Sequence, residues 1–174
     1  LVQKLRAGGK YIRYPEILAR TGWTTGELAA AMADYAFEQV RYDFVTLLIG
    51  VNNQFRGLST EQYRQEFESL LDAAIRLAGG QTGRIIVLSI PDYSVTPFGR
   101  ATKNAEQTSM EINQFNAIKE ESCKKKDISF IDVTGISTMA AAQPDLLAAD
   151  GLHPSGKMYG LWVEKIIPTI LQRW

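Results

Sequence analysis

The fold is indicated first by a short apolar run, "FVTLLIG" at residues 44–50. A continuous apolar run that ends in glycine is typical of a strand buried on both faces of a parallel sheet. A second run of this kind, "RIIVLSI", covers residues 84–90 and stops at Pro91, and a third, "ISFIDV", covers 128–133. Together with a short strand expected at 14–21, these runs predict a sheet of mostly buried strands.

Helical segments separate the predicted strands. Residues 24–41 are rich in alanine, and a helix is expected to begin at Ser59, with Gln62 at the spacing of a capping box. A third helix is expected at about 103–126, and the last begins after Pro154. Regular alternation of strands and helices predicts an α/β fold of three layers, α/β/α, in which helices cover both faces of a parallel sheet.

Length and composition exclude several classes of protein. The 174 residues predict one domain, 1–174, and 19 basic residues balance 19 acidic ones, so no electrostatic footprint for nucleic acid appears. One cysteine and one histidine cannot form a structural zinc site. No apolar run approaches the ~20 residues of a membrane span. We therefore expect no nucleic-acid partner, no metal and no membrane-spanning segment.

The only histidine, His153, follows Asp150 by three residues in the stretch "DGLHP". A carboxylate that accepts a hydrogen bond from Nδ1 orients an imidazole and leaves Nε2 free to take a proton. The spacing is therefore suited to a general base. In the alternative interpretation, Asp150 caps the following helix and His153 is an ordinary loop residue.

Two further segments follow predicted strands, where ligands of parallel sheets gather. After residues 44–50, Gly50 permits a sharp turn, and the Asn52 side chain can offer an N–H to a developing oxyanion. After residues 14–21, Gly22 can offer its backbone N–H. The alternatives are a plain asparagine-rich turn and a helix start at which Thr24 is the N-cap.

Together, these segments resemble the SGNH, or GDSL-type, hydrolase family. Its second block is similar to the stretch with Gly22, its third block to Gly50-Val51-Asn52-Asn53, and its last block to Asp150-Gly151-Leu152-His153. The resemblance implies a flavodoxin-like sheet of strand order 2-1-3-4-5 and an ester hydrolase without cofactor. It also implies that His153 is the base, Asp150 its orienting partner, and Gly22 and Asn52 the oxyanion donors.

The sequence departs from the family pattern at two places. Asn53 stands where the family usually has aspartate, so we expect it, with Gly50, only to support the turn. The Gly-Asp-Ser block that carries the nucleophile is missing. Ser94 is the best substitute within the chain, but it does not precede Gly22 as the family order requires. We therefore expect that strand 1 and the nucleophilic serine lie upstream of residue 1.

The predicted function is hydrolysis of a small carboxylic ester, such as a lipid, a short acyl ester or an acylated sugar. Trp23, Phe55 and Tyr93 are expected to line the substrate site, although each could instead be ordinary packing. The main alternative is a binding module of the same fold that has lost its nucleophile. A flavin or nucleotide binder is disfavoured because no glycine-rich phosphate loop follows a predicted strand.

Overall fold

The computed structural model describes residues 1–39, 41–102 and 104–173. Its sheet has three parallel strands in the order β1-β2-β3: β1 (Val45–Leu47), β2 (Ile85–Leu88) and β3 (Ser129–Ile131). The register pairs residue 45 with 85 and residue 87 with 130. All three strands lie within the apolar runs that predicted them, and their order agrees with the last three strands of the expected sheet.

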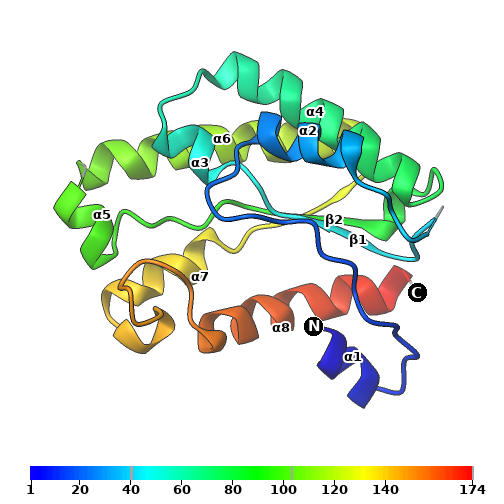
Figure 1. Cartoon of the computed structure of the whole chain (residues 1–174). Coiled ribbons are helices and arrows are strands. Elements are labelled where there is room, and N and C mark those ends of the chain that lie inside the picture. The colour runs from blue at the N-terminus through cyan, green and yellow to red at the C-terminus, as the bar shows by residue number, and fades with distance from the viewer. Residues whose placement is uncertain (40, 103, 174) are drawn as a thin grey trace.

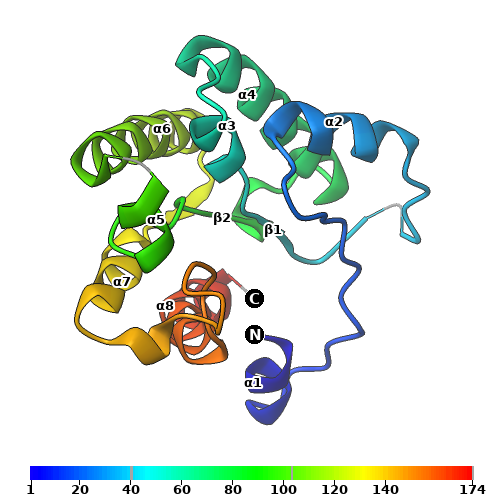
Figure 2. The ribbon, with the colours of Figure 1, turned by 60° about the vertical axis from the view of Figure 1, so that its left-hand side comes forward.

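Helices flank both faces of the sheet (Figure 1). One face is covered by α2 (Thr25–Asp34), α4 (Thr60–Leu77) and α6 (Ala105–Lys125), and the other by α8 (Gly156–Arg173). The short α1 (Val2–Ala7) lies against α8 (Figure 2), where Lys4 and Glu164 form an ion pair. No helix within the described residues is both long and apolar enough to span a membrane.

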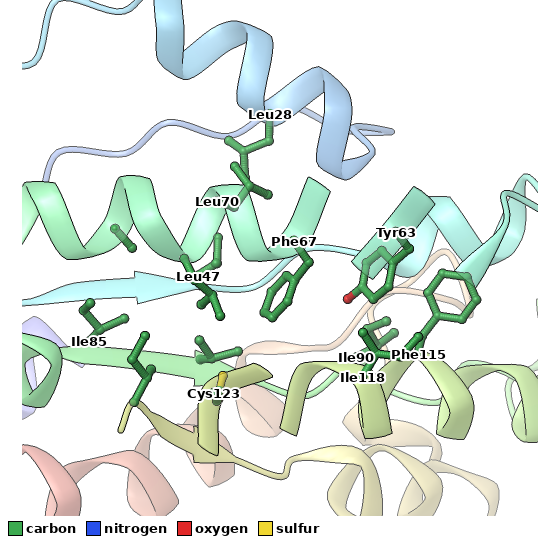
Figure 3. Packing of buried hydrophobic residues seen from close by; sticks show 14 of the residues in the cluster. Leu28, Leu47, Tyr63, Phe67, Leu70, Ile85, Ile90, Phe115, Ile118 and Cys123 are labelled. Atoms are coloured by element: carbon green, nitrogen blue, oxygen red, sulfur yellow. The ribbon is translucent and has the colours of Figure 1, made fainter. Parts of the chain in front are cut away.

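The larger of two hydrophobic clusters lies between the sheet and the α2–α4–α6 layer. Tyr63, Phe67 and Leu70 of α4 pack there with strand residues such as Ile85 (Figure 3). Burial of large aromatic and aliphatic side chains stabilises such a layer by roughly 1.5–3 kcal/mol for each side chain. The second cluster, centred on Trp162, joins the opposite face of the sheet to α8.

The expected strand at 14–21 is wrong. No regular structure is assigned between Gly9 and Arg20, and the Tyr14 side chain is 89% exposed. The chain between α1 and α2 passes the β1 side of the sheet without joining it (Figure 2). A strand requires a hydrogen-bonded neighbour, and β1 has β2 as its only partner within the described residues.

Helix starts follow the sequence signals closely. The Thr24 hydroxyl accepts from the Glu27 N–H, and the Glu27 carboxylate accepts from the Thr24 N–H, which makes a complete capping box. At α4, the Ser59 hydroxyl accepts from the Gln62 N–H, as predicted. The reciprocal contact, from the Ser59 N–H to the Gln62 side-chain oxygen, is not formed among the described residues, and the Gln62 amide nitrogen donates to Glu66.

Three short helices stand between the longer elements, and the first of them begins at the turn that was expected after Gly50. They are α3 (Val51–Phe55), α5 (Pro97–Thr102) and α7 (Thr134–Thr138). Figure 1 shows α3, α5 and the orange loop that precedes α8 at the same end of the sheet. This is the end at which the parallel strands terminate, and it is where the candidate site residues lie.

Candidate active site

The Asp150–His153 pair is formed in the structure. Nδ1 of His153 lies 2.6 Å from Oδ2 of Asp150. The other carboxylate oxygen, Oδ1, accepts from the backbone N–H groups of Leu152 at 3.0 Å and His153 at 2.9 Å. One side chain therefore fixes both the turn and the orientation of the imidazole ring.

The loop that carries this pair is closed by backbone contacts. Leu147 and Pro154 form an isolated antiparallel bridge, and the Ala148 N–H donates to the His153 carbonyl at 2.8 Å. The Ser155 hydroxyl accepts from the Met158 N–H in the first turn of α8. The alternative in which Asp150 caps this helix is therefore wrong, because its carboxylate serves its own turn.

The charge state of Asp150 suits an orienting role. The hydrogen bonds from the backbone N–H and the ring of His153 and from the Leu152 N–H lower the pKa of its carboxyl to about 2. The carboxylate is therefore ionised at neutral pH. The His153 side chain is 61% exposed, and within the described ranges no group bonds its Nε2. Nε2 is therefore free to accept a hydrogen bond from a hydroxyl group that approaches from the solvent side.

The turn after β1 depends on Gly50. Its φ of +119° is a left-handed conformation that favours glycine, and a Cβ there would lie 2.6 Å from the Tyr63 hydroxyl oxygen. The Gly50 carbonyl then accepts from the N–H groups of Asn53 and Gln54, which begins α3. A glycine at this position places both asparagines on a short helix at the carboxyl end of the sheet.

The two expected oxyanion donors lie on neighbouring segments. The Asn52 side chain donates one N–H to the Trp23 carbonyl at 3.0 Å, and no described residue accepts its second N–H. Gly22 has a φ of +88°, and its carbonyl accepts from Arg56 at 2.6 Å. No described residue accepts the Gly22 N–H. Each segment therefore retains one donor that no group in the described ranges accepts.

Asn53 of α3 is hydrogen-bonded to Thr25 at the start of α2, the helix that follows the Gly22 segment. Its side chain is fully buried; its oxygen accepts from the Thr25 N–H at 3.0 Å, and its amide nitrogen donates to the Thr25 hydroxyl at 2.6 Å. That hydroxyl in turn donates to Glu66 on α4 at 2.5 Å. These hydrogen bonds join the start of α2 to α3 and α4, and a polar network of this kind rigidifies a site.

Gln54 is a buried residue of the site region that the sequence did not single out. It donates to Glu111 at 2.7 Å and accepts from the Tyr93 hydroxyl at 2.9 Å. Tyr93 is buried, so its ring backs the site region instead of facing solvent. Only the position of Gln54 directly after the two asparagines could have indicated its role.

The other two expected lining residues differ in exposure. Phe55 is 39% exposed, and its ring centre lies 6.1 Å from those of both Tyr93 and Phe98. Trp23 is half-buried and packs against the larger hydrophobic cluster. An aromatic surface therefore adjoins the Asn52 turn, and Phe55 is its exposed member.

The segment between β2 and α6 connects this surface to the histidine loop. A Cβ on Gly151 would lie 3.6 Å from Pro97 at the start of α5. A small cavity between the two segments is lined by Tyr93, Leu152 and Pro154, among others. The turn at residues 50–54 and the loop at residues 147–154 therefore both contact the segment at residues 91–97. Across the described residues, no three His, Cys, Asp or Glu side chains are grouped as a metal site would require.

Comparisons with known proteins identify the family and support the α/β fold described above. The sequence profile of the GDSL-like lipase/acylhydrolase family matches residues 1–161. No curated protein shows significant sequence similarity to the chain.

Solved structures resemble the fold along most of the chain. TesA superposes with a TM-score of 0.73 at 18% identity, covering 99% of this chain and 86% of TesA. A lipase/acylhydrolase from Enterococcus faecalis gives 0.66 at 20% identity, with 87% and 72% covered. The acetylxylan esterase Axe2 from Geobacillus stearothermophilus gives 0.64 at 20% identity, with 86% and 68% covered. Because the profile spans most of the sequence, the chain belongs to the GDSL-like lipase/acylhydrolase family.

Proposed function

We propose that this protein is a serine hydrolase of small carboxylic esters in which His153 is the general base. The observation that carries the proposal is the 2.6 Å contact between Nδ1 of His153 and Asp150 in an exposed side chain whose Nε2 is unbonded in the described structure. An ionised Asp150 favours the tautomer in which Nδ1 carries the proton, and it stabilises the imidazolium formed during the reaction.

In the proposed mechanism, a serine hydroxyl attacks the acyl carbon while His153 Nε2 takes its proton. The N–H of Gly22 and the second side-chain N–H of Asn52 donate to the oxyanion; one such donor is worth about 3–4 kcal/mol in the transition state. His153 then returns the proton to the leaving alcohol, which yields an acyl-enzyme. Water activated by His153 hydrolyses this ester and regenerates the serine.

We propose that the nucleophilic serine lies upstream of Leu1. The hydroxyls of two serines close to His153 are bonded within the protein: Ser155 donates to the Asp145 carbonyl at 2.8 Å, and Ser137 donates to the Thr134 carbonyl at 2.6 Å. Ser94, the best substitute suggested by the sequence, is buried. The outer edge of β1 is unpaired in the described structure, and Leu48 beside it is 40% exposed. An additional parallel strand on this edge would bond the free groups of β1, and a serine after that strand would lie at the carboxyl end of the sheet.

The proposed substrate is a small ester: a lipid, a short acyl ester or an acylated sugar. The exposed Phe55 next to the Asn52 turn gives an apolar or sugar-stacking surface, with the half-buried Trp23 on the adjacent segment. Among the structurally similar proteins, Axe2 is described as an acetyl-xylooligosaccharide esterase.

Covalent labelling by a fluorophosphonate tests the proposal. We expect the full-length protein to be labelled on a serine that precedes Leu1 and to hydrolyse short p-nitrophenyl esters. Labelling and hydrolysis should both be lost in His153→Ala, and both should persist in Asp145→Asn, a matched exposed acid in the segment before the loop. A full-length protein that is neither labelled nor active would overturn the proposal and favour the binding module.

A further inference from the structure

A buried lysine lies beneath the candidate site. Lys119 of α6 has no exposed side-chain surface, although lysines are almost never fully buried without a partner. Its amine lies over the ring of Phe67, a residue of the larger hydrophobic cluster to which Phe115 and Cys123 of the same helix also belong (Figure 3). No carboxylate in the described part of the chain pairs with it.

The Lys119 amine bonds backbone carbonyls instead. Nζ donates to the Ile49 carbonyl at 3.1 Å and to the Leu88 carbonyl at 2.5 Å, and it lies 5.5 Å from the centre of the Phe67 ring. Leu88 is the last residue of β2, and Ile49 directly precedes the Gly50 turn. The amine therefore bridges the two strands where their hydrogen-bonded ladder ends.

A second side chain of α6 makes a similar contact one turn earlier. Asn116 accepts from the Ile90 N–H at 2.7 Å and donates to the Ile90 carbonyl at 3.0 Å. Residues 116 and 119 lie on the same side of a helix, because residues three apart are neighbours. The helix thus holds the main chain beyond both β1 and β2 through two polar side chains.

Stability alone does not explain a lysine at this position. Burial lowers its pKa to about 7, against a smaller opposing effect of the nearby Cys123 thiol, so burial disfavours the charged form. A well-packed apolar side chain in place of a buried charge is often neutral or stabilising. A neutral amine still has two N–H donors, one for each carbonyl. The geometric bridge therefore persists in either protonation state.

We propose that Lys119 is a positioning residue of the ester-hydrolase site, holding the Gly50 turn against the end of β2 and so fixing where Asn52 presents its free N–H. This inference rests on the proposed function for its catalytic consequence. Its structural part, that the amine orders the turn, stands on the two carbonyl contacts.

The test compares Lys119→Met with Cys123→Ala in the full-length protein. Methionine fills the site without donors, and Cys123 is a buried neighbour on the same helix that contacts neither strand end through a hydrogen bond. We expect Lys119→Met to lower kcat by roughly ten- to a hundredfold with KM nearly unchanged, because a donor misplaced by about 1 Å costs up to about 10²-fold. The kcat of Lys119→Gln, which keeps an N–H₂ group on a shorter side chain, should lie between the kcat of the wild type and that of Lys119→Met.

Hydrogen exchange gives a readout that does not depend on activity. The amides of residues 50–53 should exchange faster in Lys119→Met, while those of β2 and β3 stay protected and Cys123→Ala matches the wild type. Unchanged exchange at 50–53, or a uniform loss of protection across the core, would overturn the inference. Inactive wild-type protein would overturn the proposed function instead, and exchange alone would then decide the role of Lys119.

Discussion

The two halves of the candidate site are held in different ways. The base half, Asp150 and His153, is formed by contacts within three residues of sequence, and both side chains are more than half exposed. The donor half, around Gly22 and Asn52, is held by contacts across long sequence separations: Asn53 bonds a residue 28 positions away, and Lys119 one 70 positions away. Asn53 and Lys119 are both fully buried.

Because of this difference, substitutions in the two halves should affect activity and folding stability to different degrees. A change at an exposed local pair should alter activity with little effect on folding, because few buried contacts depend on it. A change beneath the donor half should affect the fold, because each buried polar group that loses its partner costs about 1–3 kcal/mol. Substitutions that distinguish activity from stability therefore test the comparison directly.

The largest expected effect is on activity, at Asp150. Asp150→Asn removes the charge that orients His153 and should lower kcat by up to about 10⁴-fold, the scale of a misoriented base. The midpoint of thermal unfolding should move little, since the side chain is exposed. Steady-state kinetics and calorimetry on the same sample check both parts, with Asp145→Asn as the control. A large fall in the midpoint with kcat preserved would reverse the proposed division of roles.

In the donor half, the adjacent residues Asn52 and Asn53 allow the same substitution to be compared at an activity-related and a structural position. Asn52→Ala removes a proposed oxyanion donor and should lower kcat by about 10²- to 10³-fold, with only a small loss of stability. Asn53→Ala leaves the buried Thr25 N–H without its acceptor, removes one of the two bonds of the Thr25 hydroxyl, and should lower the free energy of unfolding by about 1–3 kcal/mol. Denaturant unfolding and esterase kinetics of the two variants should give opposite rankings. If the rankings agree, the two residues do not have separate roles.

The last expected effect is a pH dependence of stability in the donor half. The pKa of Lys119 is about 7 when folded and near 10.5 when exposed, so the unfolded chain binds more protons between these values. Stability, measured as Tm, should therefore rise with pH from about 7 towards 10. Lys119→Met should abolish this contribution, and an identical slope in both proteins would contradict it.

The base half of the site could be predicted because its geometry is local. The Asp-x-x-His spacing favours a local contact between the carboxylate and the ring of His153, and only the structure excludes the alternative in which Asp150 caps the next helix. The positive φ of Gly50 and the cap at Thr24 were predictable for the same reason, since glycine and threonine act on their own turns.

The parts that could not be predicted depend on partners distant in sequence. Lys119 lies in a helix whose composition is polar, and nothing near it in the sequence indicates that the ends of two strands bond its amine. Residues 14–21 have the composition of a strand, but pairing requires a neighbour that local sequence cannot specify. The buried bond between Gln54 and Tyr93 is likewise a tertiary contact between segments far apart.

The tautomer of His153 tests the central claim most directly. As the only histidine of the 174 residues, it should give one pair of ring nitrogens in a long-range ¹H–¹⁵N spectrum, recorded at a pH where the ring is neutral. The account predicts that Nδ1 carries the proton and Nε2 is the free base, and that Asp150→Asn loses this preference. A ring that carries its proton on Nε2 in the wild-type protein would contradict the account, because His153 could not then accept a proton from a serine at that atom.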